Sequence, residues 1–293
     1  MLYKANAKIN LSLDVERKRP DGYHDVRMIM QSVNICDYLD ITKNDEKRII
    51  ITCDNAEVPC NESNLVYRAA SKLMEHMGQS HGITIKLTKN IPIAAGMAGG
   101  SADAAATLVG VNEVLDFNLK EYELRKIGAT LGADIPFCIM GGTCISEGIG
   151  DILTPIDTAP PCFLVIAKPD INVSTKFVYD NLKLGTDAVN PNVDNMISAI
   201  ANGDLQEVSN NLGNILETVT IPAYPVIEDI KSLLLQEGAL GSLMSGSGPT
   251  VFGIFTDEDS AHSAKEMLNS KIRLKQSFVT TLASKGIEKV FKV

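Results

Sequence analysis

The glycines of the stretch Ile91-Pro-Ile-Ala-Ala-Gly-Met-Ala-Gly-Gly-Ser-Ala-Asp-Ala-Ala-Ala106 carry the clearest chemical signal in the chain. Glycine lets backbone N–H groups approach a ligand closely, and the N-terminus of a helix carries partial positive charge. An alternating strand-like run, Ile83-Thr-Ile-Lys-Leu-Thr88, precedes the glycines, and an Ala-rich helical stretch from Ala102 toward Leu115 follows them. Such a turn at the start of a helix binds phosphate. The alternative is an ordinary glycine turn in which Ser101 is the N-cap of the helix.

Two familiar nucleotide-binding patterns do not fit this loop. No lysine follows the glycines, so the loop is not of the G-x-x-x-x-G-K-[ST] type. Gly96, Gly99 and Gly100 do not form G-x-G-x-x-G, and no clear strand ending in an acidic residue follows the helix. A phosphate held here must be held in another way.

Polar residues in apolar surroundings are the second signal. Residues 7–15 alternate as a strand, with Lys8, Asn10, Ser12 and Asp14 on one face and apolar residues on the other. For the strand alone, a solvated polar face is the simpler interpretation. Farther along, Asp134 lies among apolar neighbours just before Pro136. It is either a catalytic acid or base, or a buried acid that caps a turn.

Length and composition limit the possible classes of protein. A chain of 293 residues exceeds the usual size of one core, so two domains are expected. Its 45 % hydrophobic and 22 % charged residues are typical of a globular protein. The net charge of −9 argues against a nucleic-acid partner but allows a small basic pocket for an anionic metabolite.

Targeting and metal signals are weak in this sequence. No apolar run is long enough to span a bilayer, and the N-terminus has no signal-peptide core, so no membrane association is expected. The six cysteines include no C-x-x-C pair, which favours buried thiols in a reducing compartment and predicts a cytoplasmic protein. The four histidines show no H-x-x-x-H spacing, so no zinc site is predicted.

Strands and helices alternate along both halves of the chain and predict an α+β fold. Strands are expected near 28–33, 48–53, 83–88, 163–167 and 277–282, and helices near 64–78, 102–115, 122–131, 176–182, 196–216, 226–236 and 257–270. A Pro-rich shift at residues 154–161 divides the chain into domains 1–156 and 157–293. A second Gly/Ser turn, within Leu243–Phe255, precedes a strand.

Three motifs, in this order, resemble the GHMP small-molecule kinases. They are Lys8-Ile-Asn-Leu-Ser-Leu13 with Arg19-Pro-Asp-Gly-Tyr-His24, the stretch Pro92–Ala105, and Met244-Ser-Gly-Ser-Gly-Pro-Thr250. The resemblance implies two domains, each a mixed or antiparallel sheet packed with helices, with the active site in the cleft between them. It also implies ATP and Mg²⁺. Asp-Gly-Tyr-His and Gly-Ala-Asp-Ile-Pro narrow it to kinases that phosphorylate the 2-hydroxyl of cytidine-diphosphate-linked methylerythritol, in the non-mevalonate route to isoprenoid precursors.

The glycine loop departs from the pattern Gly-Leu-Gly-Gly-Gly-Ser-Ser that is usual in this family. Met97 replaces the leucine, Ala98 replaces a glycine, and Ala102 replaces the second serine. Leucine and methionine are close in volume. Ala98 is expected to keep a negative φ, because alanine tolerates positive φ poorly. With the second hydroxyl lost, Ser101 is the remaining loop side chain for a Mg²⁺ site.

The resemblance also implies a role for each site residue. Asp134 is the general base, and Lys8 polarises the attacked hydroxyl and screens the γ-phosphate. Nucleotide-binding residues are Asn64, near the adenine, and Pro92, Ala94, Ala95, Gly96, Met97, Ala98, Gly99, Gly100, Ser101 and Ala102. Substrate-binding residues are Asn10 at the erythritol, Tyr23 stacking on the cytosine, His24 at the base edge, Tyr179 as a second ring, and Ser245, Gly246, Ser247 and Gly248 over the phosphates.

Simpler interpretations remain open for several of these residues. Asn64 could be a plain N-cap, Phe177 competes with Tyr179 and either ring could be helix core, and the segment 245–248 could be a tight turn between strands. A homoserine or mevalonate kinase, and a non-catalytic nucleotide-binding protein on the same scaffold, are the rival functions. The Asp-Gly-Tyr-His turn argues against the first rival, and retention of Lys8 and Asp134 argues against the second.

Overall fold

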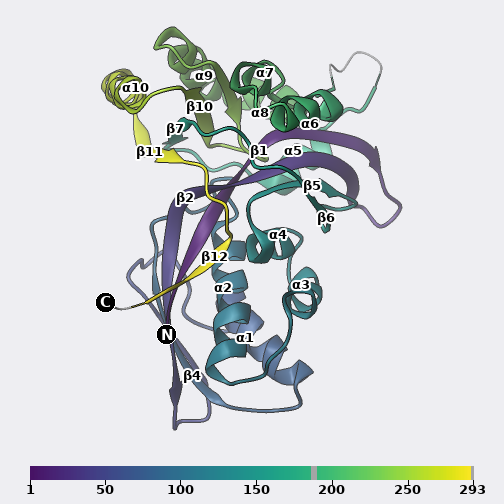
Figure 1. Ribbon diagram of the computed structural model, residues 1–293, viewed down its shortest axis with the longest axis vertical. Helices are drawn as coiled ribbons and strands as arrows, with labels where there is room; N and C mark the ends of the chain where they lie inside the picture. Colours follow the sequence, from purple (N-terminus) through teal and green to yellow (C-terminus); the bar gives the residue numbers. More distant parts are fainter. Residues whose placement is uncertain (186–189, 292–293) are drawn as a thin grey trace.

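The computed structural model describes residues 1–185 and 190–291, so residues 186–189 and 292–293 of the second expected domain lie outside it. Helices cover two β-sheets, which confirms the predicted α+β class (Figure 1). Within the described ranges, no helix is both long and apolar enough to cross a membrane.

The larger sheet is built around two long antiparallel strands, β1 (Leu2–Lys18) and β2 (His24–Asn44). Its strand order is β12-β1-β2-β4-β3, with β5 paired to β2, β6 paired to β5, and β8 paired in parallel to β1. The remaining strands of this sheet are β3 (Ile49–Cys53), β4 (Gly82–Thr88), β5 (Thr143–Glu147), β6 (Ile152–Pro155), β8 (Gly213–Asn214) and β12 (Ile287–Val290).

Four helices of the first half pack beside the larger sheet, and α2 lies directly against β1 and β2 (Figure 1). They are α1 (Leu65–His76), α2 (Gly99–Val114), α3 (Glu121–Ala129) and α4 (Ile135–Met140). Alanines 102, 104, 105 and 106 are fully buried, because their small side chains let α2 approach its neighbours closely. Gly110 continues this contact, since a Cβ there would lie 2.5 Å from Ile41.

The smaller sheet is antiparallel, in the order β11-β7-β10-β9. Its strands are β7 (Phe163–Pro169), β9 (Gly241–Met244), β10 (Val251–Phe255) and β11 (Leu274–Thr281). Helices α9 (Val226–Gln236) and α10 (Glu258–Lys271) pack on it. The other helices of this half are α5 (Thr175–Asn181), α6 (Val193–Ala201), α7 (Leu205–Asn210) and α8 (Glu217–Ala223).

One long predicted helix is wrong. Residues 196–216 contain most of α6, all of α7 and strand β8 rather than a continuous helix. Gly203 adopts a φ of +66°, a left-handed conformation that glycine accepts readily, just after the end of α6. Asp204 then caps α7 by accepting a hydrogen bond from Glu207 N at 3.0 Å. The apolar spacing continued across a break that local backbone chemistry imposes.

The polar face of β1 is buried rather than solvated, which corrects the simpler interpretation of its alternation. Lys8 is 5 % exposed, and Asn10 and Ser12 are fully buried. These residues do not all share one face, because the register with β2 shifts between Asn10 and Ser12, so Leu13 rather than Ser12 lines the same internal space as Lys8 and Asn10. Both β1 and β2 also contact α6 (Figure 1). The division at 156/157 stays a prediction; two strands that follow it, β8 and β12, return to pair with β1.

Candidate active site

The glycine loop leads directly into α2, with Ala98 at the N-cap position. Ala98 has φ 56° and ψ 28°, so the expectation of a negative φ is wrong. An alanine in this left-handed region costs about 1 kcal/mol relative to the right-handed one. Ser101 lies inside the first turn of α2 and is not its N-cap, which removes the plain-cap interpretation of that residue.

The second Gly/Ser turn packs against this loop from the other half of the chain. Ser245 Oγ donates a hydrogen bond to the Gly96 carbonyl oxygen at 3.0 Å. A Cβ on Gly96 would lie 2.4 Å from the Ser245 carbonyl oxygen, and Gly96 has φ +71°. Both facts require glycine at position 96, because any side chain would push the two turns apart.

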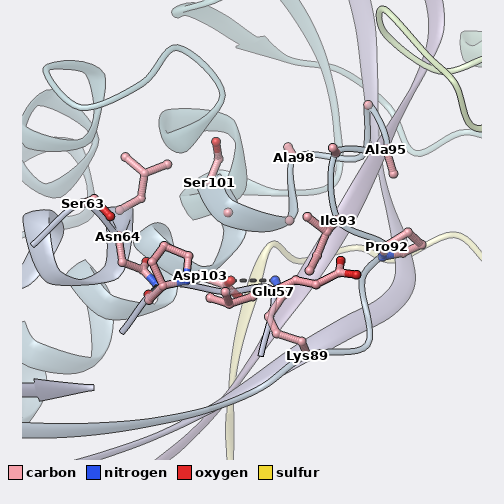
Figure 2. A pocket seen from close by; sticks show the side chains of 17 residues that line it. Glu57, Ser63, Asn64, Lys89, Pro92, Ile93, Ala95, Ala98, Ser101 and Asp103 are labelled. Carbon is pink, nitrogen blue, oxygen red and sulfur yellow. Dashed lines mark hydrogen bonds and ion pairs between the residues drawn. The ribbon is translucent and has the colours of Figure 1, made fainter. Parts of the chain in front are cut away.

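A hollow of about 430 Å³ opens along the glycine loop (Figure 2). Asn64 lines it and is also the N-cap of α1, as the simpler interpretation predicted: Asn64 Oδ1 accepts from Val66 N at 2.9 Å. Met97 and Ala102 do not line this hollow, because their side chains are buried in the core. The predicted nucleotide-binding residues that do line it, besides Asn64, are Pro92, Ala94, Ala95, Gly96, Ala98, Gly99, Gly100 and Ser101.

Several residues of this hollow were missed from the sequence. They are Glu57, Val58, Pro59, Ser63, Leu65, Lys89, Ile93 and Asp103. The signal for Asp103 is a single acidic residue inside an otherwise apolar helical stretch, and Lys89 stands just before the loop. Burial and the neighbouring Asp37 carboxylate raise the pKa of Asp103.

A second hollow, of about 750 Å³, lies on the other side of the loop and is lined from both halves of the chain. It shares Gly96, Ala98 and Ser101 with the first hollow, so the two spaces meet at the glycine loop. The predicted residues that line it are Lys8, Asn10, Tyr23, His24, Asp134, Tyr179, Gly246 and Ser247. Thr175, Lys176 and Asp180 of the α5 region also line it and were not predicted.

Lys8 and Asp134 therefore converge on one space, although 126 positions separate them in the sequence (134 − 8). Lys8 Nζ donates to Asn10 Oδ1 at 2.8 Å, and the backbone N of Lys8 donates to the Met97 carbonyl oxygen at 3.2 Å. Strand β1 is thereby tied to the glycine loop. Asp134 holds the N-cap position of α4, but its half-buried side chain makes no capping hydrogen bond. Its carboxylate is thus not occupied in the turn-capping role that the simpler interpretation gave it.

Tyr23, His24 and Tyr179 all line the second hollow. The rings of His24 and Tyr179 lie 5.1 Å apart between centroids at 37°. Tyr23 lines the hollow with a side chain that is 61 % exposed. Phe177 is 42 % exposed and does not line the hollow, so the geometry favours Tyr179 as the second ring. Burial, and to a lesser degree Lys18, lowers the pKa of His24.

The segment 245–248 divides its residues between two tasks. Gly246 and Ser247 line the second hollow, whereas Ser245 and Gly248 do not. Ser245 is fully buried with its hydroxyl bonded to the glycine loop, and Ser247 Oγ lies 2.8 Å from Thr175 Oγ1. The turn therefore supports the loop with one serine and faces the hollow with the other.

The described side chains do not form a metal site built from protein ligands alone. Over residues 1–185 and 190–291, no group of three or more His, Cys, Asp or Glu side chains could hold an ion. All six cysteines are free thiols.

Two adjoining hollows that meet at a glycine loop and a helix N-terminus are the arrangement expected of a small-molecule kinase, and comparison with known proteins shows that class. The family models described as GHMP kinases N terminal domain and GHMP kinases C terminal match residues 64–142 and 196–274. A homoserine kinase from Cytophaga hutchinsonii shares the fold, with a TM-score of 0.79 at 21 % identity over 98 % of this chain and 96 % of that one.

Other relatives narrow the class. The chain is 50 % identical to the 4-diphosphocytidyl-2-C-methyl-D-erythritol kinase of Lachnoclostridium phytofermentans, covering 94 % of this chain and 95 % of the relative. It is 47 % identical to that of Caldicellulosiruptor bescii, covering 96 % and 98 %. A crystal structure of 4-(cytidine 5'-diphospho)-2C-methyl-D-erythritol kinase matches with a TM-score of 0.81 at 31 % identity, over 97 % of this chain and 99 % of that one. The chain belongs to the 4-diphosphocytidyl-2-C-methyl-D-erythritol kinase family of the GHMP kinases.

Proposed function

We propose that this protein transfers the γ-phosphoryl group of ATP to the 2-hydroxyl of 4-diphosphocytidyl-2-C-methyl-D-erythritol, a step of the non-mevalonate route to isoprenoid precursors. One observation carries the proposal: two hollows share Gly96, Ala98 and Ser101, and Lys8 and Asp134 line only the second. A nucleotide in the first hollow would present its terminal phosphate, across the shared loop, to an acceptor in the second. The names of the relatives support the choice of acceptor, and membership of a kinase family supports ATP as the phosphoryl donor.

The first hollow suits a nucleoside triphosphate. The N-terminus of α2 and the loop amides offer N–H donors and partial positive charge to phosphate oxygens. Asn64 and the apolar residues Val58 and Leu65 also line the hollow and offer a surface that a nucleobase would fit. The strained conformation of Ala98 turns the chain into α2 at the point where the phosphates would lie.

In the reaction, the acceptor oxygen forms a new bond to the γ-phosphorus. The bond from that phosphorus to its bridging oxygen breaks, and ADP leaves with the electron pair. The proton of the hydroxyl passes to the Asp134 carboxylate, which is free of capping hydrogen bonds. Lys8 places a positive charge beside the transferring group, and Asn10 holds its ammonium in place. Most of the catalysis in such a site is positioning and charge stabilisation.

Magnesium fits this site as an ion that arrives with the nucleotide. When bound, Mg²⁺ would neutralise negative charge on the phosphates during the transfer. It takes most of its ligands from phosphates and water, so it does not need a group of three or more protein ligands, and the described residues form no such group. Ser101 lines both hollows, and its hydroxyl is the side-chain group that would hold the Mg²⁺ ion.

The acceptor's cytosine would lie against the aromatic residues of the second hollow. Tyr23 and Tyr179 offer ring faces, and His24 offers a ring nitrogen to the base edge. Asn10 lies next to Lys8 and would contact the erythritol part, while Gly246 and Ser247 approach its phosphates. This arrangement favours an acceptor that carries a nucleobase over homoserine or mevalonate, which carry none.

A coupled assay of ADP release tests the proposal, with the cytidylyl acceptor, homoserine and mevalonate compared under the same conditions. We expect turnover with the cytidylyl acceptor only, dependent on ATP and Mg²⁺. Turnover with homoserine or mevalonate, and none with the cytidylyl acceptor, would refute it. The expectations of a cytoplasmic location and of no nucleic-acid partner stay predictions.

A further inference from the structure

Three charged side chains are buried together beside the nucleotide hollow, and none of them has a role in the chemistry above. Lys89 Nζ forms ion pairs with the carboxylates of Asp37 and Asp103, the latter at 2.7 Å (Figure 2 shows Lys89 and Asp103). The side chains are 4 %, 0 % and 4 % exposed for Lys89, Asp37 and Asp103. Buried charges are expensive unless they are paired, so this cluster holds its members together strongly.

The cluster joins the entry and the exit of the glycine loop to the larger sheet. Asp37 lies on β2, and its Oδ1 accepts hydrogen bonds from the backbone N–H groups of Asn90 at 2.6 Å and Ile91 at 2.8 Å. These residues begin the loop. Asp103 lies in α2, one turn after Gly99, where the loop has ended. Lys89 connects the two carboxylates, so both ends of the loop are held at one point.

We propose that Asp37, Lys89 and Asp103 are positioning residues for the nucleotide, which lock the two ends of the glycine loop so that its amides face the phosphates. This inference rests on the proposed function only in that a nucleotide occupies the first hollow. The loop needs such a lock, because it holds Ala94 and Ala98 at φ of 51° and 56°, conformations that a free alanine leaves readily.

The three residues are not equivalent, and the difference provides a test. Asp37 uses both oxygens: Oδ1 accepts from two backbone N–H groups and Oδ2 contacts Lys89. An asparagine at 37 would present an NH₂ group either to the lysine ammonium or to the backbone donors. Asp103 uses only Oδ2, and its buried Oδ1 has no hydrogen-bond partner. An asparagine at 103 can therefore keep its one contact through the amide oxygen.

The experiment measures ADP binding by calorimetry in wild type and in Asp37→Asn, Lys89→Met and Asp103→Asn, together with the KM for the acceptor and the thermal midpoint. Lys289→Met is the matched control, since Lys289 on β12 pairs with Glu113 near the opposite end of α2. We expect D37N and K89M to weaken ADP binding by about tenfold or more, as expected when a buried polar group loses its partner. D103N should stay within about threefold of wild type, and the acceptor KM should stay near wild type in every variant.

Wild-type ADP affinity in D37N and K89M would overturn the proposal. A loss of ADP affinity in D103N as large as that in D37N would also overturn it. So would a loss of ADP affinity accompanied by an equal rise in the KM for the acceptor. If K289M lost as much ADP affinity as K89M, general destabilisation would explain the effect and the proposal would fall. A wild-type protein that binds ADP but does not phosphorylate the acceptor would refute the proposed function, while the ADP dissociation constants would still decide this inference.

Discussion

Replacing Asp134 with asparagine tests the proposed general base with little change in shape. The residue is half-buried at the N-cap position of α4 and makes no capping hydrogen bond there. Its loss should therefore change the free energy of unfolding by no more than about 0.5 kcal/mol. Asp134 does not line the nucleotide hollow, so ADP affinity should also be unchanged. Loss of a general base lowers kcat by about 10²–10⁴-fold, which corresponds to about 3–5 kcal/mol in the activation barrier.

The assay follows ADP release at saturating ATP and acceptor, with calorimetric ADP binding and thermal unfolding measured on the same preparations. Asp194→Asn is the matched control, because Asp194 is an exposed acid that pairs with Arg27 at 2.7 Å and does not line the second hollow. The control should keep wild-type kcat. The role of Asp134 is refuted if D134N turns over within about threefold of wild type, or if its kcat loss is accompanied by an equal loss of ADP binding.

Three further predictions concern the second hollow. Tyr23→Ala should raise the KM for the acceptor by about tenfold, because a stacked base contributes roughly 1–3 kcal/mol. The KM for ATP should stay unchanged. Steady-state kinetics that vary each substrate in turn measure both constants, and a rise confined to the KM for ATP would mean that the ring faces the nucleotide. Lys8→Met combined with D134N should cost far less than the product of the two single losses in kcat, since the two residues act as a unit; a double-mutant cycle with additive effects would separate their roles. Burial lowers the pKa of His24 below its ordinary value of 6.5, so the imidazole stays neutral as the pH falls to about that value. The acceptor KM should be flat above that pH and rise only below it in a pH series, and His24→Asn should remove the rise.

Local features of the sequence predicted much of the fold. The β4 strand, the glycine turn and the start of α2 follow from alternation, backbone freedom and helix propensity over a few residues. The helices α1, α9 and α10 were also predicted close to their observed bounds. The wrong and missed elements lie where a local sequence pattern is compatible with more than one structure. Residues 196–216 kept an apolar spacing across the break at Gly203, and β12 was missed because its pairing partner, β1, lies at the other end of the chain.

The sequence by itself determined which residue types this protein has available: a flexible turn before a helix, a lysine and an asparagine on one strand face, an acid before a proline, and a tyrosine–histidine turn. These depend on interactions between near neighbours in the chain. Only the tertiary structure decided that Lys8 and Asp134 line one hollow, that the strand face carrying Lys8 is buried, and that Ala98 adopts a left-handed conformation. The reason is that side-chain alternation records which residues share a face, but not what covers that face. Whether a backbone conformation is held depends on contacts with segments more than a hundred residues away, as between Gly96 and Ser245.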